Sequence, residues 1–110
     1  MRQATIFYKG EEAGILEQHD EGSFTFRYLE AWLADPANPS ISLTLPRSQP
    51  EHHAAYLLPF FYNMLPEGTN RQIVCKANRL DSDDYFGILM TTARYDTVGA
   101  VTVKKIKRIK

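Results

Sequence analysis

Cysteine, glycine and long apolar runs are all scarce in this sequence of 110 residues. Cys75 is the one cysteine, so an internal disulfide is excluded and a reducing cytosol is compatible with the sequence. The six glycines are scattered, and they form neither a phosphate-binding loop nor a dinucleotide fingerprint. No apolar run approaches the roughly 20 residues of a membrane span, and the amino terminus lacks a signal-peptide core. We therefore expect a cytoplasmic protein that binds no cofactor.

Net charge is also absent, because 13 basic residues balance 13 acidic residues. The chain as a whole therefore has no field that would attract nucleic acid or anionic lipid. Hydrophobic residues at 44% and charged residues at 24% are typical of a globular protein, and the length suits one domain with a single core. We expect that domain to cover residues 1–103, followed by a basic tail at residues 104–110.

Alternating apolar and polar residues predict several strands in the first half of the chain. Residues 3–9, 13–18 and 23–28 are β-rich and joined by short polar turns, which indicates an antiparallel meander. Residues 40–45 resume the alternation, with Ile41, Leu43 and Leu45 expected to point inward. This segment is predicted to be the fourth strand.

Residues 54–71 hold the densest apolar and aromatic run in the chain. Helical spacing places one set of these side chains on a single face that should join the core: Leu57, Phe60, Phe61, Met64 and Leu65. Pro66 lacks a backbone N–H and Gly68 tolerates a positive φ, so both should end this helix.

Two more helices and a last strand are expected after that stop. A helix capped by Thr69 or Asn70 should run to Leu80, with an apolar stripe of Ile73, Val74, Ala77 and Leu80. Acidic cap residues at positions 81–84 predict a third helix from about residue 82 to 93, and residues 99–103 form a β-branched run. The fold class is therefore α+β, with an antiparallel sheet of about five strands and three helices inserted before the last strand.

Candidate catalytic and metal-binding residues have simpler structural explanations. His52 and His53 follow Glu51, but adjacent histidines diverge on a helix, so two solvated side chains are favoured over a metal site. Cys75 has no neighbouring base in sequence, which favours a small buried side chain over a nucleophile. The acidic residues at 81–84 are explained by helix capping. We therefore expect no catalytic residue and no metal ligand.

Trp32 and the basic carboxyl end each allow two readings. The one tryptophan is expected in the core beside the Pro36–Pro39 loop, although isolated aromatic residues also anchor interfaces. Five of the 13 basic residues lie in the last seven positions. The tail could contact phosphates or an acidic partner, or it could be a frayed strand in solvent.

Asn63, Glu67 and Arg71 are polar residues spaced by four among aromatic neighbours. Glu67 could cap the following helix and pair with Arg71, in an exposed bridge worth at most about 1 kcal/mol. The same residues could instead form a rigid corner that binds another protein. The residues alone leave both readings open.

Several ordered blocks carry a resemblance to a known family. The segment Phe60-Phe61-Tyr62-Asn63-Met64-Leu65-Pro66-Glu67-Gly68 with Arg71 resembles the aromatic-rich LPEG signature in the amino-terminal subdomain of HipA-type serine/threonine kinases. Further blocks agree in order at residues 26–28, 32–36, 42–46, 84–89 and 96–101. The resemblance extends from about Ala4 to Val103, and Arg94 departs from it where a glycine is expected.

The resemblance implies a protein-binding role. In HipA-like kinases the nucleotide-binding loop and the catalytic aspartate follow this subdomain, so no catalytic residue is transferred and we expect no enzyme activity. A free-standing subdomain is similar to HipS, which neutralises the shortened kinase HipT in tripartite toxin–antitoxin modules. The implied partner-binding residues are Asn63, Leu65, Pro66, Glu67, Gly68 and Arg71.

Three hypotheses follow from this resemblance and from the charge pattern. The leading one is an antitoxin or regulatory subunit that binds and restrains a separate HipA/HipT-like kinase. The second is an accessory subunit needed for folding of an active kinase or for its assembly with a HipB-like helix-turn-helix repressor, which would contact nucleic acid only through the complex. The weakest is direct nucleic-acid binding through Lys104 and the residues after it.

Overall fold

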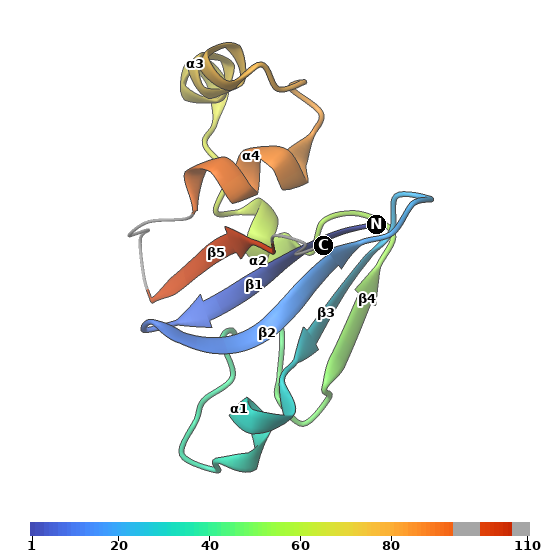
Figure 1. Ribbon diagram of the computed structural model, residues 1–110, viewed down its shortest axis with the longest axis vertical. Coiled ribbons are helices and arrows are strands. Elements are labelled where there is room, and N and C mark those ends of the chain that lie inside the picture. The colour runs from blue at the N-terminus through green and yellow to red at the C-terminus, as the bar shows by residue number, and fades with distance from the viewer. Residues whose placement is uncertain (94–99, 107–110) are drawn as a thin grey trace.

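The computed structural model describes residues 1–93 and 100–106, and a five-stranded antiparallel sheet forms its centre (Figure 1). The strands are β1 (Arg2–Tyr8), β2 (Glu11–Gln18), β3 (Phe24–Tyr28), β4 (Glu51–Ala54) and β5 (Val101–Lys105). Their order is β4-β3-β2-β1-β5, so the last strand returns to the edge beside the first. The α+β class and the five-stranded sheet are thus confirmed.

The described residues contain four helices, one more than predicted. They are α1 (Glu30–Ala34), α2 (Pro59–Tyr62), α3 (Gly68–Asn78) and α4 (Tyr85–Thr92). α2 and α4 cover one face of the sheet, where Phe61 lies 5.6 Å from Phe26 and Phe86 lies 6.0 Å from Phe24, measured between ring centroids. α3 lies beyond α4, at the opposite end of the molecule from α1 (Figure 1).

The covered face of the sheet holds the core. Phe24, Phe26 and Tyr28 alternate onto this face, and all three are buried. Gly14 on β2 leaves room for the Phe26 ring: a Cβ atom there would lie 2.6 Å from that ring and 2.6 Å from the carbonyl oxygen of Arg27. Glycine is therefore required where β2 passes the fully buried Phe26 ring.

The opposite face of the sheet is built from polar cross-strand contacts. Glu17 on β2 accepts hydrogen bonds from Gln3 at 2.6 Å and from Arg27 at 3.2 Å. The Thr25 hydroxyl lies 2.8 Å from Nε2 of His19 and 2.9 Å from Nδ1 of His53. These contacts satisfy the buried polar groups of Glu17 and Thr25. Buried polar groups are costly when they are left without a partner, so the contacts stabilise this face.

The predicted strand at residues 40–45 is wrong. The segment is an irregular loop in which Ile41 and Leu45 are buried while Leu43 is 99% exposed. The Tyr28 hydroxyl holds the loop, because it accepts the N–H of Ile41 at 3.0 Å and donates to the carbonyl of Leu45. The fourth strand in chain order is instead β4 (Glu51–Ala54), which pairs with β3.

The helix predicted to begin in residues 54–71 and to stop at Pro66 and Gly68 is much shorter than expected, because α2 covers only Pro59–Tyr62. The segment contains the end of β4, the single turn of α2, a tight turn and the start of α3. Pro59 begins α2, and the N–H groups of Met64 and Leu65 then bond three residues back, to Phe61 and Tyr62. The expected core residues largely hold, since Leu57, Phe61 and Leu65 are buried and Phe60 and Met64 pack against the core.

The helices after residue 67 differ from the prediction in their caps and in one face. Glu67, rather than Thr69 or Asn70, occupies the N-cap position of α3, and its side chain makes no capping bond. The predicted stripe is confirmed only in part: Leu80 packs against the core and Val74 is half-buried, but Ile73 is 60% exposed and Ala77 is exposed. Cys75 is the residue of α3 that is buried. α4 begins at Tyr85 rather than near residue 82, and Asp84 is its cap.

The structure describes Trp32 and the start of the basic carboxyl end, but not Arg94 or the last four residues. Trp32 is buried, donates from Nε1 to the carbonyl of Pro39 at 2.9 Å and contacts the Tyr8 ring edge, as the core reading predicted. Lys104 and Lys105 belong to β5. Arg94, residues 96–99 and residues 107–110 lie outside the described residues.

Candidate functional site

The residues predicted to bind a partner lie in one corner of the molecule, between α2 and α3. Leu65 is buried and anchors the corner, and Pro66 is half-buried. Asn63, Glu67 and Gly68 are exposed, and the φ of +54° at Gly68 matches the predicted positive φ. The corner therefore presents a backbone turn and polar side chains on a hydrophobic anchor.

The Glu67–Arg71 ion pair, one of the two readings that the sequence left open, does not form among the described residues. The two residues are joined only by a long backbone bond, from the N–H of Arg71 to the carbonyl of Glu67 at 3.5 Å. The geometry of the turn explains this, because Glu67 is extended at φ −117° and ψ 156° and lies outside the helix. The Glu67 side chain is left free in solvent.

Arg71 is held by aromatic rings and a backbone carbonyl instead. Its Nε donates to the carbonyl of Pro66 at 3.0 Å. Its guanidinium carbon lies 5.7 Å from the ring centroid of Tyr62 and 5.5 Å from that of Tyr85, within the range of cation–π attraction. The two tyrosine rings meet edge to face at 5.4 Å, so α2, α3 and α4 are joined at this point.

Tyr85 is a site residue that the sequence analysis did not select. It lies far from Arg71 in the sequence, and only the return of the chain into α4 brings the two together. The sequence signal for Tyr85 is its position directly after Asp84, the acidic cap of α4. The cap fixes where the first side chain of the helix points. Tyr62 was part of the aromatic motif but was not chosen for a role.

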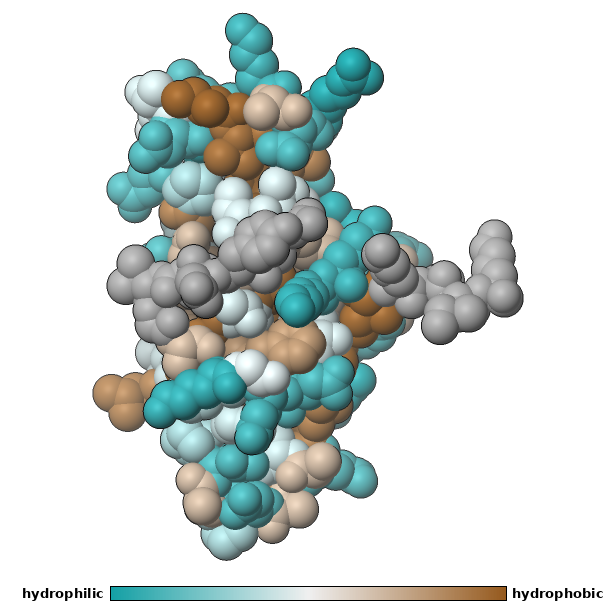
Figure 2. All heavy atoms as spheres, turned by 60° about the vertical axis from the view of Figure 1, so that its left-hand side comes forward, coloured by the Kyte–Doolittle hydropathy of each residue, from teal (hydrophilic) through white to brown (hydrophobic). Residues whose placement is uncertain are grey.

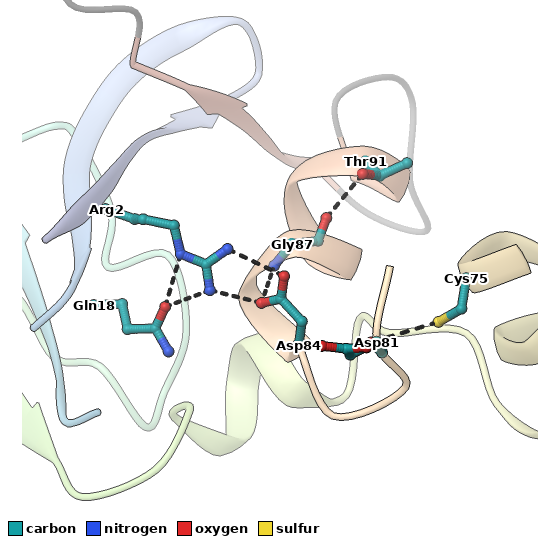
Figure 3. Close-up of polar contacts among 7 residues, drawn as sticks. All are labelled: Arg2, Gln18, Cys75, Asp81, Asp84, Gly87 and Thr91. Atoms are coloured by element: carbon teal, nitrogen blue, oxygen red, sulfur yellow. Dashed lines mark hydrogen bonds and ion pairs between the residues drawn. The ribbon is translucent and has the colours of Figure 1, made fainter. Parts of the chain in front are cut away.

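Asp84 fixes the start of α4 and therefore the position of Tyr85. Its carboxylate accepts the N–H of Gly87 at 3.1 Å and two bonds from Arg2, at 2.6 Å and 3.2 Å (Figure 3). Gln18 accepts from the other side of the same guanidinium, at 2.9 Å from Nε. The hydrogen bonds from Arg2 hold the pKa of Asp84 below its usual value, so the carboxylate stays charged.

Other groups of chemical interest are occupied by structural contacts. Cys75 is buried, and its Sγ lies 3.9 Å from the carbonyl of Asp81 (Figure 3). His52 is buried against Phe26, with Nε2 at 3.2 Å from the carbonyl of Pro46, which corrects the expectation that both histidines are solvated. The described residues contain no group of three or more side chains that could hold a metal ion.

The exposed surface around α3 is partly apolar. Figure 2 shows brown side chains gathered among teal ones at the end of the molecule that α3 occupies. Ile73 is 60% exposed there, and Tyr62 at the nearby corner is 41% exposed.

Lys104 lies in β5, with Nζ at 5.2 Å from the Phe7 ring. None of the helices in the part of the chain that the structure describes has the length and apolarity that a bilayer crossing needs.

Comparison with known families gives a match over nearly the whole chain. Residues 4–104 match the family described as the HipA N-terminal domain. The chain belongs to this family. A solved structure described as the N-terminal domain of HipA toxin superposes with a TM-score of 0.74 and 26% sequence identity, covering 99% of this chain and 96% of that one.

Two relatives of this HipA N-terminal domain differ greatly in length. An uncharacterised protein of Haemophilus influenzae is 29% identical over 108 residues, which are 98% of this chain and 96% of that protein. A Sinorhizobium fredii protein named "Putative kinase Y4mE" is 28% identical over 89 residues, which are 81% of this chain and 21% of that protein. The domain therefore occurs in these relatives both as nearly a whole protein and as part of a much larger one.

Proposed function

We propose that this chain is a non-catalytic regulatory subunit that binds a separately encoded HipA-like serine/threonine kinase and restrains it, acting as an antitoxin. The observation that carries the proposal is the pair of relatives. One is a small protein that consists almost entirely of this domain, and the other has a name that describes a kinase and contains the domain as about a fifth of its length. A domain that packs onto a kinase within one chain can bind the same surface as a separate chain.

The corner between α2 and α3 supports this proposal as the docking site. The buried Leu65 anchors the corner, and the Arg71 side chain is held by its contacts with Pro66, Tyr62 and Tyr85. Fixed side chains lose little conformational entropy on binding, which favours a specific interface. We expect partner binding by Asn63, Leu65, Pro66, Glu67, Gly68 and Arg71, with Leu65 acting from beneath the surface.

Growth of cells that express both proteins tests the proposal. A HipA-like kinase from the same genome is induced with this chain, or with the same gene interrupted by an early stop codon. A restraining subunit should restore growth only when the protein is made. Growth arrest that persists at full expression of both proteins would contradict the proposal.

A second candidate function is an accessory subunit that an active kinase requires for folding. The S. fredii relative favours it, because the domain is part of the longer chain in that protein. The growth experiment separates the two functions, since toxicity would then require this chain. The kinase alone would be insoluble or harmless, and co-expression would arrest growth.

A further inference from the structure

Arg71 is a cation whose orientation is fixed but whose charge has no partner among the described residues. The ion pairs of the described chain involve Arg2 and Arg27, the amino terminus and His53, and none of them includes Arg71. We propose that Arg71 is the receptor for an aspartate or glutamate side chain on the docking face of the kinase. This inference rests on the proposed function and names the chemistry of one contact in that interface.

Among residues 1–93 and 100–106, the two terminal nitrogens of the Arg71 guanidinium make no hydrogen bond or ion pair. A guanidinium has five N–H donors in a planar fork. Nε of Arg71 donates inward to the carbonyl of Pro66, and Tyr62 and Tyr85 hold the group through cation–π contacts. The two terminal nitrogens carry the remaining donors, and that pair matches the two oxygens of a carboxylate.

The charges around Arg71 favour an acidic partner. Glu67 precedes the helix without pairing with Arg71, and Asp84 is occupied by Arg2 and the N–H of Gly87. From Gly68 to Asn78, α3 carries Arg71 and Lys76 and no acidic residue. A partner that covered this corner with apolar groups alone would bury an uncompensated charge, which is strongly unfavourable. A carboxylate placed against the free edge of the guanidinium removes that penalty.

Pre-organisation explains why an arginine is used rather than a lysine. A lysine ammonium is a point charge on a flexible stem, and it cannot form two parallel bonds to one carboxylate. The tyrosine rings and the Pro66 carbonyl already restrict Arg71 in the free protein. Less rotamer entropy is therefore lost when the carboxylate binds.

Binding of the kinase to single variants of this chain tests the inference. The dissociation constant is measured by calorimetry for the wild type, Arg71→Gln, Arg71→Lys and the matched control Lys76→Gln, each at low and at high salt. Arg71→Gln should weaken binding by about tenfold or more, because a hydrogen-bonded charge pair is lost. Arg71→Lys should lose most of the same affinity, and Lys76→Gln should stay within about twofold of the wild type.

The dissociation constants of the variants separate the carboxylate receptor from the docking proposal. Wild-type binding with an unchanged Arg71→Gln variant, or with Arg71→Lys equal to the wild type, overturns the carboxylate receptor and leaves the docking proposal intact. An equal loss for Arg71→Gln and Lys76→Gln also overturns it, because a general charge effect would then suffice. Failure of the wild type to bind the kinase removes the docking proposal and this inference together. Thermal unfolding of each variant confirms that the corner is folded.

Discussion

At the scale of single residues, buried polar groups explain how an irregular segment is held without secondary structure. The Tyr28 hydroxyl connects the end of β3 to two backbone groups of the following loop, at Ile41 and Leu45. Burial raises the pKa of Tyr28, so the hydroxyl remains a protonated donor through the neutral range. One side chain thereby fixes the loop that replaces the predicted fourth strand.

Tyr28→Phe should destabilise the domain by about 1–3 kcal/mol, because a buried N–H and a buried carbonyl lose their partner. Urea denaturation followed by circular dichroism measures this loss. Tyr56→Phe is the matched control, since Tyr56 is 83% exposed and should change the free energy of unfolding very little. Equal stability of the two variants would show that the Tyr28 hydroxyl does not hold the loop.

The Arg2–Asp84 contact predicts a dependence of stability on acid. The pKa of Asp84 is lower in the folded chain than its ordinary value of 3.8, chiefly because Arg2 donates to it. The contribution is therefore present above that ordinary value and is lost as the pH falls through the lower pKa of the folded state. Arg2→Gln should reduce this loss, so its free energy of unfolding should fall less steeply below about pH 4.

Denaturant unfolding of the wild type and Arg2→Gln across the acid range measures this difference. Lys9→Gln is the control, because Lys9 is an exposed lysine in the turn after β1 and does not contact Asp84. Parallel curves for Arg2→Gln and the wild type would mean that Arg2 does not lower the pKa of Asp84.

At the scale of elements, α3 and α4 are neighbouring helices with very different support. Four of the eight residues of α4 are buried, but in α3 only Cys75 of 11 residues is buried. Helices with few buried apolar contacts open more readily than the core. α3 is therefore held by few contacts, those of Arg71 with Tyr62 and Tyr85 at its first turn and the burial of Cys75 further along.

Amide hydrogen exchange should show this difference directly. We expect the hydrogen-bonded amides of α3 to exchange faster than those of α4 in the free protein, with α4 serving as the internal control. Tyr85→Leu should increase exchange in α3 further, because it removes one of the two rings that hold Arg71. Equal protection of α3 and α4 in the wild type would contradict this account of the helix.

The elements also show what the sequence could predict. The first three strands, β5 and α4 follow local signals such as alternation and an acidic cap, and these signals gave their positions to within a few residues. β4 has no such signal, because Glu51-His52-His53-Ala54 lacks apolar alternation and becomes a strand only by pairing with β3. The helix in the apolar run is shorter than predicted, because it begins only at Pro59 and a turn follows Tyr62.

The sequence predicts only those parts of the candidate site that lie close together along the chain. Its residues in one continuous segment, from Asn63 to Arg71, could be chosen from the sequence. Tyr85 could not, because its contact with Arg71 depends on how α4 returns across α2. The absence of the Glu67–Arg71 pair likewise depends on the backbone of the turn rather than on spacing.

At the scale of the whole molecule, the domain has a single core, and the corner proposed for docking lies away from the sheet. The described part extends 42 × 29 × 29 Å, and the corner lies where α2, α3 and α4 meet. The two relatives place the same domain in a small protein and in a longer one with a kinase name. The proposed regulatory subunit, which would bind a separate kinase, rests on these two occurrences.

The phosphorylation rate of a purified HipA-like kinase from the same genome, measured while this chain is titrated in, tests the central claim most directly. The account predicts that the rate falls and reaches its minimum near one chain per kinase, and that Arg71→Gln shifts the titration to higher concentration. A rate that stays constant or rises throughout the titration would contradict the claim that this domain restrains the kinase.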